Sequence, residues 1–125
     1  MAELAAVVFA VTIAGVVAFQ LALAMGVPWG EYAMGGAVRG RFPPALRVLA
    51  LVQAGLLAIL GLIVLGHVGI GPLARSGVPI WVAVATSLLA VLLNAASRSG
   101  GERRIWVPVS LVLLGSSLVV ALTAG

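Results

Sequence analysis

The sequence has no cysteine, no lysine and no aspartate, and it contains a single histidine. Without cysteine, disulfides, thiolate metal sites and cysteine nucleophiles are excluded. One histidine and three acidic residues are too few ligands for a multi-ligand metal site, so we expect no metal and no other cofactor. Charge is scarce too, because only 8% of the residues are charged, against about 25% in an ordinary soluble domain. So few charges cannot form a water-exposed surface, and lipid must surround much of the protein.

Apolar residues are abundant instead and make up 63% of the 125 residues. A bilayer core about 30 Å thick is crossed by a helix of about 20 apolar residues. Four stretches approach that length, and glycine or proline bounds them. We therefore predict an all-α fold, a transmembrane four-helix bundle built from two helical hairpins. It forms a single transmembrane domain over residues 1–125, with helices at about 4–25, 44–67, 79–96 and 105–121.

The arginines predict the orientation of the bundle. Six of the seven lie in or beside the first and third connections between helices, and they are Arg39, Arg41, Arg47, Arg98, Arg103 and Arg104. Only Arg75 lies in the second connection. Because positive residues stay on the cytoplasmic side, we expect both termini and His67 outside, with the chain in the cell inner (plasma) membrane. No basic face with interleaved aromatic residues is present, so nucleic acid is not an expected partner.

Small and polar residues share one face in each of the last two predicted helices. In the third helix they follow a 4-3-4-3 spacing, at Ala83, Ser87, Ala90, Asn94 and Ser97. In the fourth helix Ser110, Ser117 and Ala121 share a face. Polar residues avoid lipid, so both faces are expected to point inward. There they either join neighbouring helices closely or line a small cavity.

Three uncharged amides lie in the half of the bundle that arginine marks as cytoplasmic. They are Gln20, Gln53 and Asn94, one on each of the first three predicted helices. Because a buried amide in hydrocarbon needs partners, we expect the three to face one another or a hydrated pocket. Each alone is compatible with a purely structural hydrogen bond between helices.

The first connection carries the densest set of distinctive residues. Pro28 near its start, Glu31 after it and Gly35-Gly36 at its end predict a short helix. It would lie along the inner membrane surface with Trp29 and Tyr32 as aromatic anchors. Two interpretations remain open, an interfacial anchor and a lid over the polar cluster.

Two carboxylates accompany the cluster, Glu31 in the first connection and Glu102 in the third. Either they are solvated or paired with arginine, or they act as acid–base groups near Arg47, which opens the second helix. On the second interpretation Glu31 and Glu102 are the candidate catalytic residues, and whether the protein is an enzyme stays open. The candidate ligand-binding residues are Gln20, Trp29, Tyr32, Arg47, Gln53 and Asn94.

A resemblance covers most of the chain. It is carried by Pro28-Trp29-Gly30 after the first helix, by Arg47, and by Asn94, Ser97, Ser99, Glu102 and Arg103 before the fourth helix. In these features the sequence resembles small four-helix integral membrane proteins of unknown function that are common in GC-rich bacteria. The resemblance therefore implies an architecture and no activity. Small multidrug exporters and sterol-isomerase-like proteins differ, because they keep acidic residues inside their spans, and here no acid lies deeper than Glu3.

Three functions are compatible with this pattern. The first is binding or processing of a small lipophilic molecule in a polar-lined pocket in the cytoplasmic half of the bundle. The second is a homo-oligomeric facilitator of small-solute transport, without proton coupling because no span contains an acid. The third is a structural subunit of a larger membrane complex. The expected partners are accordingly the lipid bilayer, a small lipophilic molecule and, in the second case, further copies of the chain.

Overall fold

The computed structural model describes residues 1–74 and 76–123, so Arg75 of the second connection lies outside the described residues. Within those ranges the secondary structure is helical throughout, as predicted. Three helices are long and apolar enough to cross a membrane, and a fourth is apolar but has only 15 residues. The long helices are α1 (Ala2–Ala24), α2 (Pro44–Gly66) and α4 (Gly100–Thr123), and the short one is α3 (Trp81–Ala95).

The fourth helix begins five residues before its predicted start. Ser99 precedes its first residue, and the hydroxyl of Ser99 accepts a hydrogen bond from the backbone N–H of Glu102 at 3.1 Å. A serine that caps the third helical N–H in this way stabilises a helix start by about 1 kcal/mol. Gly100 and Gly101 therefore form the first turn of α4. Sequence analysis had assigned them to the separation between two helices.

The first connection also differs from its predicted form. In place of one short helix it contains two single turns of 3-10 helix, η1 (Gly30–Tyr32) and η2 (Met34–Gly36). The extended backbone of Ala33 (φ −140°, ψ 157°) separates the two turns, and positive φ angles at Met34 (51°), Gly35 (69°) and Gly36 (76°) rule out regular helix after it. The turns fold the connection back on itself, because the N–H of Gly30 donates to the carbonyl of Gly40 at 2.9 Å.

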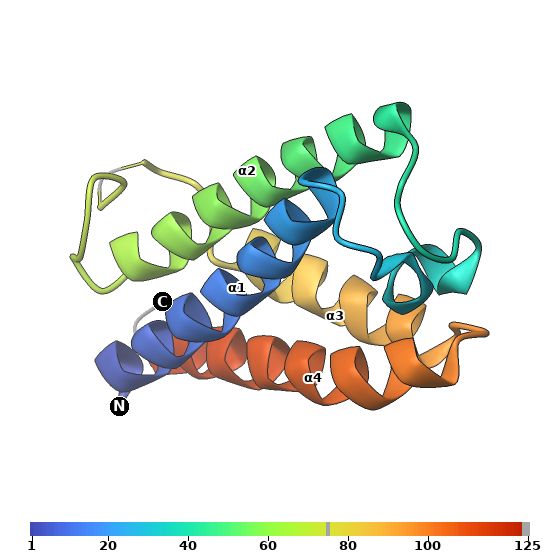
Figure 1. Ribbon diagram of the computed structural model, residues 1–125. Helices are drawn as coiled ribbons and strands as arrows, with labels where there is room; N and C mark the ends of the chain where they lie inside the picture. Colours follow the sequence, from blue (N-terminus) through green and yellow to red (C-terminus); the bar gives the residue numbers. More distant parts are fainter. Residues whose placement is uncertain (75, 124–125) are drawn as a thin grey trace.

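Helix α1 lies at the centre of the arrangement and packs against both α2 and α4 (Figure 1). Helix α3 packs mainly against α4 and touches α2 only slightly. The first connection and the α3–α4 turn lie at one end of the molecule, here called the connection end. The start of α1, the end of α4 and the α2–α3 connection lie at the other, the terminal end (Figure 1).

The larger core lies toward the terminal end and joins all four helices. It includes Phe9 of α1, Val64 of α2, Ala83 of α3 and Val120 of α4, each fully buried. The predicted inward faces are confirmed in this region. Ser87 of α3 and Ser117 of α4 are buried like the apolar residues around them. Within the described chain, the Ser87 hydroxyl donates to the carbonyl of Ala83, four residues earlier in its own helix.

The contact between α1 and α2 is close at one glycine. A β-carbon added at Gly61 would lie 2.8 Å from a methyl group of Ile13, closer than packed carbon atoms normally approach. Gly55, on the same helix, has open space around the corresponding position. Glycine at position 61 therefore sets the distance between the two helices, as small residues do at helix contacts in membranes.

We expect Gly61→Leu to lower the midpoint of thermal unfolding in detergent, because an overpacked contact costs about 1–3 kcal/mol. Gly55→Leu is the matched control and should leave the midpoint at or above that of the wild type. Equal midpoints for the two variants would contradict the close α1–α2 contact.

Candidate functional site

Three hydrogen bonds fasten the first connection to the beginning of α4. A carboxylate oxygen of Glu102 accepts from the backbone N–H of Gly35 at 2.8 Å. The hydroxyl of Ser99 donates to the carbonyl of Glu31 at 2.7 Å. The indole N–H of Trp106 donates to the carbonyl of Tyr32, also at 2.7 Å. Residues 67 to 74 positions apart in sequence are thus held together, and the connection is fixed over the connection end.

Glu102 is the central group of this attachment, and its side chain is only 6% exposed. It sits in the first turn of α4, where the positive end of the helix dipole favours a carboxylate. The Ser99-x-x-Glu102 spacing is that of a capping box, in which the glutamate normally reaches back to the N–H of the capping residue. Here the N–H of Ser99 donates to the hydroxyl of Ser97 at 3.1 Å. The carboxylate of Glu102 therefore accepts from the N–H of Gly35 instead.

Aromatic rings fill the space beneath the connection. Trp29 stacks parallel to Phe19 of α1, with 6.2 Å between ring centroids and an interplanar angle of 2°. The ring of Trp106 lies tilted against the same phenylalanine at 4.7 Å. Tyr32 packs against the helix start, since a β-carbon at Gly101 would meet its ring at 2.5 Å. Trp29 is therefore packed against α1 and Tyr32 against α4, and the contact of Phe19 with both tryptophans was not predicted from the sequence.

Two buried polar atoms in this half of the molecule have no hydrogen-bond partner among the described residues. They are Oε1 of Gln20 on α1 and Nε of Arg47 on α2. Gln20 follows Phe9 and Ile13 along the buried face of α1, at helical spacings of four and seven residues. The guanidinium of Arg47 lies against Gly26, where an added β-carbon would collide with Nη2. One hydrogen-bond acceptor and one hydrogen-bond donor are thus buried without a hydrogen-bond partner, which is rare in native proteins.

The structure does not bring the three amides together, which corrects the expected amide cluster. Asn94 lies between α3 and α4, with its Nδ2 at 3.4 Å from both the carbonyl of Trp106 and the hydroxyl of Ser110. Gln53 is exposed on the surface of α2. The reason is the divergence of α2 and α3. Near the terminal end, Leu60 of α2 and Ile80, which directly precedes α3, share the core, whereas the side of α2 that carries Gln53 is exposed nearer the connection end.

The two carboxylates differ in their surroundings. Glu31 is exposed, and its backbone carbonyl rather than its side chain takes part in the attachment of the connection. One oxygen of Glu102 is occupied by the amide of Gly35. A catalytic role for either residue stays a prediction.

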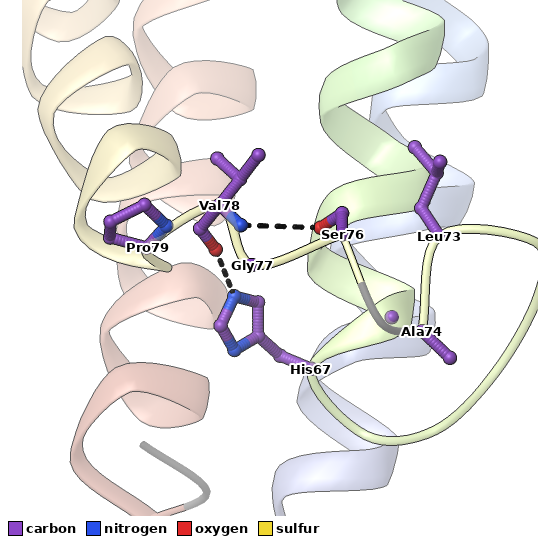
Figure 2. A pocket seen from close by; sticks show the side chains of 8 residues that line it. His67, Leu73, Ala74, Ser76, Gly77, Val78 and Pro79 are labelled. Carbon is purple, nitrogen blue, oxygen red and sulfur yellow. Dashed lines mark hydrogen bonds between the residues drawn. The ribbon is translucent and has the colours of Figure 1, made fainter.

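A separate hollow of about 450 Å³ lies at the terminal end, under the α2–α3 connection. Figure 2 shows the ring of His67 directed at the carbonyl of Val78, to which Nε2 is hydrogen-bonded at 2.8 Å. The N–H of Val78 in turn lies 3.4 Å from the Ser76 hydroxyl. Sequence analysis treated His67 only as an interfacial residue, and no spacing in the sequence indicates this contact. The histidine holds the connection over the end of α2.

A second hollow, of about 310 Å³, runs between α1 and α2 and is almost wholly apolar. The hollow exists because small residues on the two helices do not fill the space between them. These residues are Ala10 and Ala14 of α1 and Ala58 and Gly61 of α2. Neither hollow includes any of the predicted catalytic or ligand-binding residues. Comparison of the chain with protein families, curated proteins and solved structures finds no match.

We expect Glu102→Ala to loosen the first connection, because a hydrogen bond to a charged group contributes about 1.5–3 kcal/mol. Arg39 and Arg41 are exposed in that connection, so trypsin can report on its opening. In detergent, cleavage there should be roughly tenfold faster than in the wild type.

Glu31→Ala is the control, since its side chain is exposed and the Ser99 hydroxyl bonds to its backbone. Trypsin should cut this variant at the wild-type rate. If Glu102→Ala were cleaved no faster than Glu31→Ala, the attachment through Glu102 would not control the connection.

Proposed function

We propose that this protein binds a small lipophilic molecule in the half of the bundle near the connection end. The observation that carries the proposal is the pair of buried polar atoms without partners, Gln20 Oε1 and Arg47 Nε. Leaving such an atom unsatisfied costs about 1–3 kcal/mol, and a bound polar group would recover that energy. The apolar helices around them suit a ligand that enters from lipid.

The two atoms also restrict the ligand's polar group. Gln20 Oε1 needs a donor, and Arg47 Nε needs an acceptor. A hydroxyl group can serve either atom, whereas a carboxylate can accept from Arg47 Nε but has no hydrogen to donate to Gln20 Oε1. The ligand class is therefore a long-chain or polycyclic alcohol, or a neutral lipid with a free hydroxyl.

The first connection acts as the cover of this site. Its attachment through Glu102, Ser99 and Trp106 closes the connection end, and opening it would admit or release the ligand. If the protein is an enzyme, Glu31 is the freer of the two carboxylates, because one oxygen of Glu102 is already bound.

We further propose that the four helices cross the inner membrane of a bacterial cell as two hairpins. The connection end would face the cytoplasm, both termini would lie outside, and η1 and η2 would rest in the interface. The arginine distribution supports this orientation, since Arg39, Arg41, Arg98 and Arg103 all flank the connection end. The aromatic cluster of Trp29, Tyr32 and Trp106 is typical of such an interface.

We expect Gln20→Leu to keep or raise the thermal unfolding midpoint of the ligand-free protein, because it removes an unsatisfied buried oxygen. The same substitution should reduce labelling by a diazirine-bearing hexadecanol in liposomes by roughly tenfold. Mass spectrometry of the labelled peptides would locate the probe. In the wild type, the label should concentrate on the last two turns of α1 and the first two of α2.

Thr12→Val is the matched control on the same helix, because its hydroxyl already donates to the carbonyl of Val8 at 2.7 Å. This variant should retain wild-type labelling. A lower unfolding midpoint in Gln20→Leu with unchanged labelling would identify Gln20 as a structural residue and contradict the site.

A further inference from the structure

Gln53 is an exposed amide near the middle of an apolar helix. It is the tenth residue of the 23-residue helix α2, about 13 Å from the first residue at 1.5 Å per residue. Hydrocarbon offers no hydrogen-bond partner at that depth. The only charged residue of α2, Arg47, lies on a different face, against Gly26. An outward amide there therefore calls for a partner molecule that can both donate and accept.

The residues around Gln53 form one stripe along α2. Leu46, Leu49, Gln53, Leu56 and Leu60 follow a 3-4-3-4 spacing, which places them on one face of the helix. Leu60 is buried in the core that α2 shares with the start of α3. Leu49 and Leu56 are 40% and 63% exposed. The stripe is thus covered at the terminal end and open at its centre, because α3 diverges from α2.

The open part of the stripe can pair with the same part of a second copy, through both hydrogen bonding and leucine packing. A primary amide carries one acceptor oxygen and two donor hydrogens, so two glutamines related by a two-fold axis can each donate to the other. Leucines at 3-4 spacing on either side interdigitate with the same leucines of a parallel copy. Arg47 points away from the stripe, so the α2 helices bring no like charges together. An acyl chain could cover the leucines but could not hydrogen-bond Gln53.

We propose that the protein forms a parallel homodimer through α2, in which Gln53 of one copy hydrogen-bonds to Gln53 of the second copy. Leu49 and Leu56 flank this pair and exclude lipid from it. The open part of the stripe, from Leu49 to Leu56, is separate from the buried Gln20 and Arg47, whereas Leu46 packs in the same cluster as Phe42 of the first connection.

The absence of cysteine allows the interface to be mapped by single-cysteine crosslinking in native membranes. Leu49→Cys and Leu56→Cys should give disulfide-linked dimers at least fivefold more abundant than Val48→Cys and Leu51→Cys. The two control positions are on the same helix at similar depth and are also exposed, at 63% and 55%. Equal crosslinking at all four positions, or none at any, would overturn the proposal.

Energy transfer between labelled copies diluted in liposomes tests the role of the amide. Gln53→Leu should raise the dimer dissociation constant by about three- to thirtyfold, the range expected for a hydrogen bond between helices in a membrane. Gln53→Asn keeps the self-complementary group and should restore most of the affinity. An unchanged constant in Gln53→Leu would refute the amide pair. A monomeric wild type whose α2 stripe is labelled by the diazirine hexadecanol would show that a ligand covers Gln53.

Discussion

The structure depends on one constraint, that a polar group placed among apolar helices must find its partner within the protein. Hydroxyl side chains meet it locally. Thr86, Ser87 and Ser116 each donate to the carbonyl four residues earlier in the same helix. These groups therefore need no ligand and no water. For the serine faces of α3 and α4, this favours close helix packing over a polar cavity.

An acceptor oxygen cannot use the same solution. In the middle of a helix every N–H already donates to its own helix, so the oxygen of Gln20 has no backbone donor within α1. The N–H of Arg47 Nε is likewise buried without an acceptor in the described chain. Gln53 instead faces outward. The polar groups without a partner in the described chain thus lie in the half of α1 and α2 nearer the connection end. A ligand or a second copy of the protein could hydrogen-bond to them there.

The first connection closes the same end by a different means. Its backbone groups cannot be satisfied by regular helix, because Ala33 is extended and φ is positive from Met34 to Gly36. Side chains from the start of α4 supply the partners, with Glu102 and Trp106 reaching two successive stretches of the connection. The stack of Phe19 on Trp29 completes the contact with α1. Phe42 of the connection is also buried against Leu23 of α1 and Ala50 of α2, so an apolar cluster and a few hydrogen bonds together hold the connection.

The presence of the four helices and the inward faces of α3 and α4 could be predicted from the sequence. Hydrophobic length and the position of serine and alanine along a helix are local properties, and the prediction at Ser87 and Ser117 was confirmed by burial. The start of α4 could also have been predicted from Ser99 and Glu102, because the Ser-x-x-Glu spacing of a capping box is visible in the sequence. Only the tertiary structure decided that Glu102 holds Gly35 and that Gln20 and Gln53 do not meet. Those outcomes depend on how far α2 and α3 diverge, and packing over the whole bundle sets that distance.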